Sequence, residues 1–197
     1  HLFSSAASDV YKRQVLKFVI SQALNNTTVQ VDLNNINKLP RETDVAMSFY
    51  NSKSNKLMHT YTHTLNRNQL PDTFALDPIY TYKMVVHTVP EVVVDNIKLI
   101  PGKHNTIVAQ TPQGVLKLNT QGSNSQFTGI NVIVRKENEY KTINIHKMNS
   151  EKEYLLGKYD LEMLTLPRIY FEDVEIKQSK TTEITICLLY TSPSPRD

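Results

Sequence analysis

Two stretches of nine residues decide the fold: Tyr82-Lys-Met-Val-Val-His-Thr-Val-Pro90 and, 77 positions later, Tyr159-Asp-Leu-Glu-Met-Leu-Thr-Leu-Pro167. Tyr, Thr and Pro coincide without a gap, and the side chains alternate in the same way in both stretches. Alternation with a period of two is typical of a β-strand that buries one face. Each proline marks the end of its strand, because it offers no amide hydrogen to a ladder. The stretches therefore predict one long strand in each of two copies of a β unit.

The repeat extends outward from these stretches. Further runs with a period of two predict strands in the first copy at 29–33, 45–50, 57–64 and 73–76, and in the second copy at 115–118, 130–134, 142–145 and 154–156. Beyond the prolines the match continues through Asn96-Ile-Lys-Leu99 onto Asp173-Val-Glu-Ile176, and then into closing strands at 106–109 and 183–186. We therefore predict a mainly β chain with two tandem antiparallel β-sandwiches, of the Ig-like or transthyretin-like kind, at 27–111 and 112–186.

A tight turn should precede the last strand of the first copy. Pro101-Gly102 predicts a type II turn, since Pro supplies the fixed φ and Gly the positive φ. The second copy has Gln178-Ser179 at this place, and we expect it to turn less sharply.

Both ends of the chain differ from this β pattern. Residues 1–14 and 187–197 resemble translated sequencing-adapter DNA, so we expect non-native tails there and exclude them from the fold. Residues 15–26 carry apolar residues at helical spacing and end in Asn25-Asn26, which predicts one short amphipathic helix ahead of the sandwiches. That helix is too short to span a membrane.

Composition narrows the function classes. The 197 residues include 22 Lys and Arg against 19 Asp and Glu, a formal charge of +3 that is spread along the chain and does not indicate a nucleic-acid partner. Aromatic residues make up only 8% of the chain and Trp is absent, which does not favour an aromatic-lined pocket for a small ligand. A single cysteine, Cys187, excludes an intrachain disulfide and leaves the compartment open.

Two motifs resemble known bacterial modules. The pattern Leu155-x-Gly157-x-Tyr159-x-Leu161-x-Met163 resembles small extracytoplasmic β-sandwich repeats, although the first copy has Pro78 and Tyr80 in place of the Leu and Gly. The stretch from Leu16 to Val31, together with that from Lys158 to Arg168, resembles the region that follows the von Willebrand factor A (VWA) domain in bacterial proteins of that class.

That resemblance implies a place for the chain in a larger protein. The helix at 15–26 would be the last helix of an upstream VWA-like domain, and the sandwiches would be its downstream appendages in the periplasm, on the cell surface or in a secreted protein. The metal-dependent adhesion site of the family needs an Asp-x-Ser-x-Ser run, which is absent from this sequence, so no metal ligand is assigned here.

Histidines give no clear metal or catalytic motif. His59 and His63 are four apart on a predicted strand, which separates their side chains by about 13 Å. One metal ion cannot bridge that gap, since its His nitrogens lie about 2 Å away. His87, His104 and His146 are isolated, and no Gly-x-Ser-x-Gly turn supplies a nucleophile.

Aspartates and glycines have simpler interpretations. Asp72, Asp77, Asp95 and Asp173 lie near predicted strand ends, where carboxylates cap turns, and no Asp-x-Asp-x-Asp series indicates calcium. Gly114, Gly122 and Gly129 are interpreted as turn glycines, because no helix follows them to form a phosphate site.

Six tyrosines leave two interpretations open. Tyr80, Tyr82, Tyr140, Tyr154, Tyr159 and Tyr170 pack in or beside the core, or several share an exposed face that stacks on sugars. We favour core packing, which the matched pair Tyr82 and Tyr159 supports. The sequence thus predicts no catalytic, cofactor-binding or metal-binding residue and no enzyme. The predicted function is a spacer or interaction module for an unidentified protein or glycan partner, with a carbohydrate-binding sandwich as the alternative.

Overall fold

The computed structural model describes residues 27–34, 43–121 and 129–187, which divide into two compact units. The first unit comprises 27–34, 43–87 and 91–110, and the second comprises 88–90, 111–121 and 129–187. The predicted mainly β character is confirmed, with fourteen strands in the described residues. The expected tail at 1–14, the expected helix at 15–26 and all of the expected tail at 187–197 except Cys187 lie outside them.

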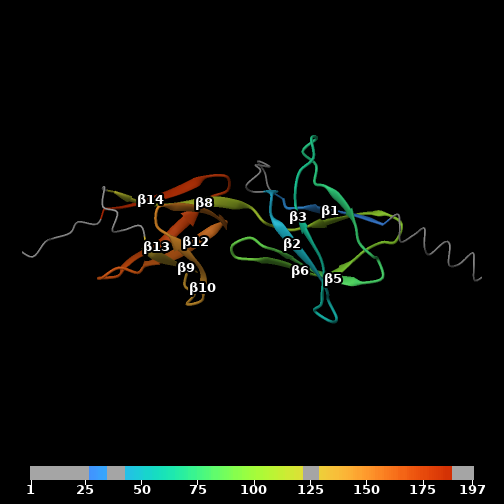
Figure 1. The fold of residues 1–197 in the computed structure, drawn as a ribbon, viewed down its shortest axis with the longest axis horizontal. Coiled ribbons are helices and arrows are strands. Elements are labelled where there is room, and N and C mark those ends of the chain that lie inside the picture. Colours follow the sequence, from blue (N-terminus) through green and yellow to red (C-terminus); the bar gives the residue numbers. More distant parts are fainter. Residues whose placement is uncertain (1–26, 35–42, 122–128, 188–197) are drawn as a thin grey trace, which may run out of the picture. The chain divides into compact units, whose positions relative to one another are not determined.

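Two sheets form the first unit (Figure 1). A three-stranded sheet has the order β4-β1-β7, and a four-stranded sheet has the order β3-β2-β5-β6. Their strands are β1 (Thr28–Asp32), β2 (Ala46–Asn51), β3 (Leu57–Thr62), β4 (Thr73–Ala75), β5 (Thr81–Val86), β6 (Val92–Lys98) and β7 (His104–Val108).

The second unit repeats this strand order. Its sheets run β11-β8-β14 and β10-β9-β12-β13, so that each strand takes the place of the strand seven earlier. The strands are β8 (Gln113–Gln121), β9 (Asn131–Lys136), β10 (Thr142–Lys147), β11 (Ser150–Leu155), β12 (Gly157–Met163), β13 (Ile169–Ile176) and β14 (Thr181–Cys187). Cys187, assigned above to a tail, thus ends a strand, where it pairs with Gln121.

Strand pairing is antiparallel with one exception in each unit. The first and last strands, β1 with β7 and β8 with β14, pair in parallel, whereas the sequence predicted antiparallel sandwiches. Parallel neighbours need a long crossover connection, which the intervening strands provide. A period of two in the sequence is the same for both orientations, so it could not reveal this difference.

The register of strand pairing shows that the two units are equivalent residue by residue. In the first unit Tyr82 pairs with Ile97 and Met84 with Val94, and the pairs 77 positions later are Tyr159 with Val174 and Leu161 with Phe171. In both ladders the pairing register shifts between those two pairs. A residue with left-handed backbone lies in each shift, Asn96 with φ of 57° and Asp173 with φ of 57°. Each unit therefore has the same β-bulge.

Each unit buries one apolar cluster between its two sheets. In the first unit Val29 and Val31 of β1 meet residues from β2 and β5, and in the second Leu116 and Leu118 of β8 meet residues from β9 and β12. Tyr82 and Tyr159 lie in these clusters with exposed fractions of 0% and 2%. Their hydroxyls donate to backbone carbonyls upstream, Tyr82 to Asp77 at 2.9 Å and Tyr159 to Leu155 at 2.8 Å.

The Thr and Pro residues of the two stretches are also equivalent in space. Thr88 donates from Oγ1 to the carbonyl of Pro90, and Thr165 to that of Pro167, each at 2.7 Å. Both prolines follow a cis peptide bond. The three identities that revealed the repeat thus correspond, in each stretch, to one buried tyrosine and one hydrogen bond from threonine to the proline carbonyl.

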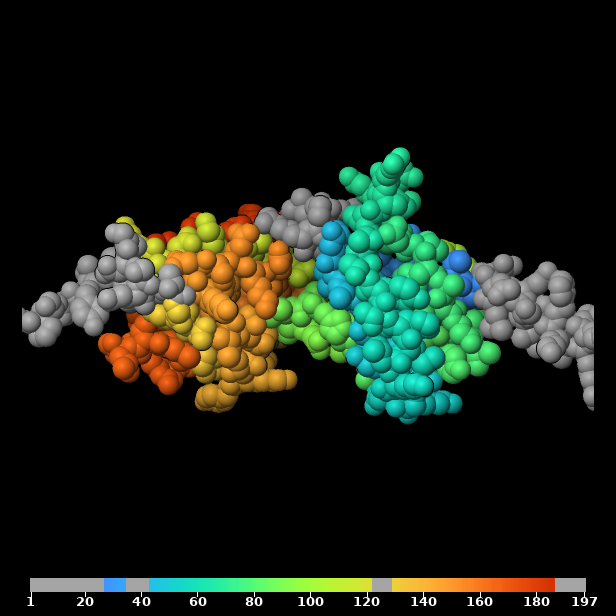
Figure 2. All heavy atoms as spheres, viewed as in Figure 1, coloured from blue at the N-terminus to red at the C-terminus, as the bar shows by residue number. Residues whose placement is uncertain are grey.

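Loops vary more than the sheets. Between β3 and β4 an isolated bridge joins Leu65 to Pro71, and Asn66 accepts from the backbone N–H of Asn68 and Leu70 through its side chain. Figure 2 shows this teal loop standing out from the surface of the first unit.

The turns before the last strands correct one expectation. Gly102 has φ of 69°, as the predicted type II turn requires, but Ser179 at the matching position has φ of 55°. The N–H of Lys103 donates to the Ile100 carbonyl at 3.4 Å, and that of Lys180 to the Lys177 carbonyl at 3.2 Å. The expected less sharp turn in the second copy is therefore wrong, and the serine accepts a backbone conformation that favours glycine.

One glycine was also misassigned. Gly114 lies inside β8, not in a turn, and a Cβ built on it would lie 2.2 Å from the carbonyl oxygen of Lys177. The close approach of two backbones thus requires glycine there. Gly129 does lie in a turn, and Gly122 is outside the described residues.

Two histidines are buried among the polar groups of the units. His63 has both ring nitrogens facing backbone carbonyls, Nδ1 at 2.5 Å from Thr43 and Nε2 at 3.0 Å from Val31. His146 lies between the Tyr154 hydroxyl at 3.1 Å and the Ser150 carbonyl at 3.2 Å, and its ring stacks on Tyr154. Burial lowers the pKa of His146 from its ordinary value of 6.5.

Replacing Ser179 by glycine should stabilise the second unit. The change removes the cost of left-handed backbone at a residue with a Cβ, about 1 kcal/mol. Hydrogen exchange of β8 and β14 amides under native conditions measures the free energy of unfolding. Gly102→Ser is the matched control, and exchange of the β1 and β7 amides should show the first unit destabilised by a similar amount. Unchanged exchange in both variants would contradict the shared turn.

Acid should destabilise the second unit through His146. Burial in the folded unit lowers the pKa of His146 and so disfavours its charged form, while the unfolded chain takes up a proton below about pH 6.5. Stability should therefore fall as pH falls from 7 to 5. His146→Gln should reduce this dependence, measured by urea unfolding of the parent chain and the variant at both pH values. An equal slope for His146→Gln and the parent chain would refute the assignment.

Candidate functional site

A cleft of about 260 Å³ lies on the four-stranded sheet of the second unit. Tyr159, Leu161 and Met163 of β12 point into the core, so alternation places Asp160 and Glu162 on the outer face, where the cleft lies. Strands β9, β12 and β13 and the β9–β10 hairpin contribute its lining: Arg135, Asn138, Glu139, Tyr140, Asp160, Leu161, Glu162, Tyr170, Phe171 and Glu172. We call this site the outer cleft.

The floor of the outer cleft is an ion-pair network. Glu162 has an exposed fraction of only 5% and lies between two guanidinium groups. Arg135 donates to its Oε2 at 2.7 Å, and Arg168 donates to its Oε1. The hydrogen bond from Arg135, helped by Arg168, holds the pKa of Glu162 below its usual range. Both oxygens of this carboxylate are therefore already occupied within the unit.

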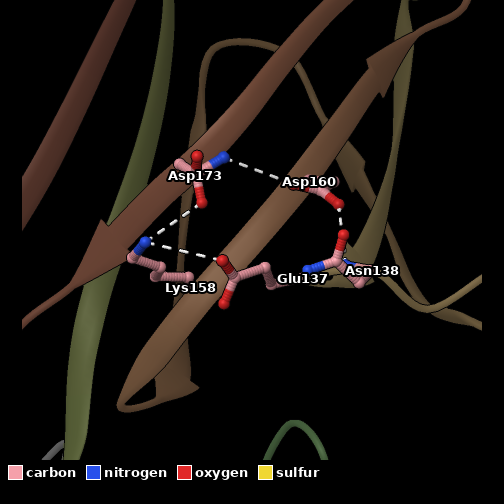
Figure 3. Close-up of polar contacts among 5 residues, drawn as sticks. All are labelled: Glu137, Asn138, Lys158, Asp160 and Asp173. Atoms are coloured by element: carbon pink, nitrogen blue, oxygen red, sulfur yellow. Dashed lines mark hydrogen bonds and ion pairs between the residues drawn. The ribbon is translucent and has the colours of Figure 1, made fainter.

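Asp160 fixes the shape of the cleft wall (Figure 3). Its two oxygens accept from the backbone N–H groups of Asn138 and Asp173, each at 3.2 Å. Both of those residues have left-handed backbone, Asn138 in the β9–β10 hairpin and Asp173 in the bulge of β13. One carboxylate thus joins the hairpin to the bulged strand and sets the position of the residues between them.

A second charged group lies beside this wall. The Lys158 ammonium is 3.1 Å from Asp173 and 3.5 Å from Glu137 (Figure 3). The hydrogen bond from Lys158 lowers the pKa of Asp173, and the same contact raises the pKa of Lys158. All three side chains are exposed, so the network orders the surface more than it stabilises the fold.

The rim of the outer cleft is aromatic and acidic. Tyr140 is 99% exposed and Tyr170 is 60% exposed. Glu139 and Glu172 also line the cleft, and within the described part of the chain their carboxylates have no hydrogen bond or ion pair. The rim therefore presents two rings and two uncompensated negative charges to solvent.

The structure separates the six tyrosines singled out above. Tyr82, Tyr154 and Tyr159 are buried, which confirms the core interpretation for these three, and Tyr80 packs edge-on against Tyr82. Only Tyr140 and Tyr170 share an exposed site, in the outer cleft. Asp160 and Glu162 stood within the stretch that decided the fold, but the sequence did not show that a hairpin and a bulge would gather other side chains around them.

His59 and His63 serve different purposes in the structure. The His59 ring stacks on Tyr61 with centroids 5.9 Å apart, while His63 is buried and bonded to the two carbonyls already described. In residues 27–34, 43–121 and 129–187, no group of three or more His, Cys, Asp or Glu side chains is arranged to hold a metal ion.

An arrangement that the sequence missed joins a serine, a histidine and a glutamate in the first unit. Ser48 Oγ is 2.8 Å from Nε2 of His87, and Nδ1 of His87 is 2.8 Å from Glu91. This is the order of groups in a hydrolytic triad. Ser48, however, is 5% exposed in the middle of β2, between core residues Met47 and Phe49, whereas a nucleophile must reach a substrate carbonyl.

The aspartates take positions at turns and bulges. Asp72 accepts from the Thr64 hydroxyl, and Asp77 accepts from the Ile79 N–H at 2.9 Å. Asp95 and Asp173 each lie in one of the two matched bulges. His104 is exposed on β7, with Nδ1 3.0 Å from the Thr28 hydroxyl.

Among the described residues, no helix has the length and hydropathy needed to cross a membrane.

Comparisons with known proteins show only weak similarity. No protein-family model and no curated protein matches the chain. Solved structures with similarity include the Bacillus anthracis TIE protein, at 11% identity and a TM-score of 0.31 over 81% of this chain and 33% of that one. A leucine-rich repeat protein from Bacteroides thetaiotaomicron has 12% identity and a TM-score of 0.29, over 82% of this chain and 26% of that one.

A third solved structure is a shaft pilin from Lactobacillus rhamnosus GG, with 9% identity and a TM-score of 0.26 over 84% of this chain and 97% of the pilin. This chain therefore spans about a third and a quarter of the lengths of the first two proteins. Similarity at this level supports no functional inference, which must rest on the residues of the site.

Proposed function

We propose that the two sandwiches form a non-catalytic spacer and interaction module of a bacterial extracytoplasmic protein that also carries a VWA domain. The outer cleft is the single observation that carries the interaction role. It exposes two tyrosine rings beside two carboxylates that have no partner among the described residues, and tyrosine is enriched at binding interfaces. The VWA context rests on the resemblance of residues 16–31 and 158–168.

The repeated architecture supports the spacer role. Two units with the same strand order and bulge provide a modular spacer built from one fold. The inner faces are filled by core side chains, which leaves the outer faces and loops for partners. Protein–protein interaction or adhesion is the function that this arrangement supports best.

Carbohydrate binding is the second candidate. It needs exposed tyrosines that share a face, and Tyr140 and Tyr170 meet that requirement in the outer cleft. A glycan array probed with the full chain tests this alternative. Binding that is lost in Tyr140→Ala and Tyr170→Ala would favour it over a protein partner.

The serine in the first unit should be unreactive. We expect no labelling of Ser48 by a fluorophosphonate, because the residue is only 5% exposed and its hydroxyl already lies against the His87 ring. Intact mass spectrometry of the labelled chain measures this, with Ser48→Ala as the matched control. Stoichiometric labelling that disappears in Ser48→Ala and in His87→Gln would show a reactive triad and overturn the non-catalytic assignment.

The genomic locus should encode a VWA domain upstream. We expect the reading frame that precedes Val15 to contain an Asp-x-Ser-x-Ser run at the end of an early strand, because the family builds its adhesion site from those oxygens. Long-read sequencing through the locus tests this directly. A different domain, or a closed reading frame, would contradict the VWA context.

A further inference from the structure

The two units differ at matched positions of their outer faces. The 77-residue offset of the repeat places Lys83, Val85, Val93 and Asp95 of the first unit where the second has Asp160, Glu162, Tyr170 and Glu172. Strand pairing likewise places Tyr50 opposite Lys83 and Arg135 opposite Asp160. The core positions of the same strands remain buried and apolar in both units. Because the first unit forms the sandwich without the charged set, this fold does not require it. The outer cleft is thus an addition to the framework.

The size of the cleft favours one side chain as its occupant. A volume of about 260 Å³ is below the range of roughly 300 to 1,000 Å³ that is typical for drug-sized ligands. An oligosaccharide would extend far beyond it. A single long side chain from a partner segment lying across the sheet face would fit within this volume.

The charge of the cleft favours a cationic side chain. Its lining has four carboxylates and the guanidinium of Arg135, and Arg168 beside it pairs with Glu162, so carboxylates still outnumber guanidiniums four to two. Asp160 and Glu162 are occupied by internal partners, so Glu139 and Glu172 are the carboxylates left for a ligand. An ammonium or guanidinium between them would also lie near the rings of Tyr140 and Tyr170, where a cation–π contact adds to the attraction.

The first unit contains an internal example of this chemistry. On its corresponding face the Lys83 ammonium lies over the Tyr50 ring, 5.2 Å from the centroid. The matched positions in the second unit are Asp160 and Arg135, so no such internal lysine fills the site. A cation supplied by another molecule would make the same kind of contact at different positions, with the rings of Tyr140 and Tyr170 at the rim.

We propose that the outer cleft binds a lysine or arginine side chain from an extended basic segment of a partner protein. This inference rests on the proposed interaction role and names the chemistry of its partner. The ammonium or guanidinium pairs with Glu139 and Glu172, and its aliphatic stem packs on Tyr140 and Tyr170.

An NMR titration of the full chain tests the proposal. The probe is the acetylated and amidated peptide Gly-Lys-Gly-Lys-Gly, added to isotope-labelled protein at low salt. We expect shifts at the amides of 138–140 and 170–172. Affinity should fall about fivefold in the double variant Glu139→Gln and Glu172→Gln, and measurably in Tyr140→Ala. Raising ionic strength to about 0.3 M should weaken binding, because exposed charges are screened over a few ångströms.

Matched controls separate this inference from general electrostatics. Asp95→Asn removes a charge at the position of the first unit that matches Glu172, and it should leave affinity unchanged. The same peptide with N-acetyllysine keeps the stem without the charge and should not bind. Because the substituted side chains are exposed, the amide spectrum should remain that of the folded chain.

Several results would overturn the proposal. It would be wrong if the N-acetyllysine peptide bound as tightly as the lysine peptide. It would also be wrong if the shifts were confined to other surfaces, or if the double variant kept the affinity of the parent chain. A neutral glycan that shifts the same amides while the basic peptide does not would replace this ligand class and leave the interaction role in place. Covalent labelling of Ser48 would instead overturn the non-catalytic role without affecting the cleft.

Discussion

A buried tyrosine in each sandwich, whose hydroxyl donates to the backbone, is the constraint on which the rest depends. Tyr82 and Tyr159 place a large ring in the core, and each must bond its hydroxyl there to avoid the cost of an unpaired buried polar group. The acceptor is a backbone carbonyl just upstream, so the bond fixes the chain as it enters the strand. That strand lies between two neighbours in its sheet and faces the other sheet, which makes it the reference for both.

With the inner faces fixed in this way, the outer faces are free to diverge. On its outer face the first unit has Lys83 over the Tyr50 ring and a hydrogen bond between Ser48 and His87. The second unit has ion pairs and the acidic, aromatic outer cleft there. In each unit these side chains project from equivalent strand pairs, β2 with β5 and β9 with β12, which have the same register. The difference between the units therefore lies in surface chemistry, and this is where we place the function.

The outer cleft depends on two backbone irregularities. A left-handed residue in the β9–β10 hairpin and another in the β13 bulge each direct an N–H group toward Asp160. That carboxylate keeps the hairpin, with Glu139 and Tyr140, beside the strand that carries Tyr170 and Glu172. The side chain that joins the hairpin to the bulge thus positions the groups that we expect to bind a partner.

The sequence by itself determined the mainly β class, the repeat and its register, because alternation and the Tyr, Thr and Pro identities report directly on burial and on strand ends. It also identified Tyr82 and Tyr159 as core residues. It did not determine the parallel pairing of β1 with β7, the turn at Ser179, the backbone contact at Gly114 or the alignment of Ser48, His87 and Glu91. These depend on contacts between segments far apart in the chain. The outer cleft was decided by tertiary structure for the same reason, since only the bulge and the hairpin bring its side chains together.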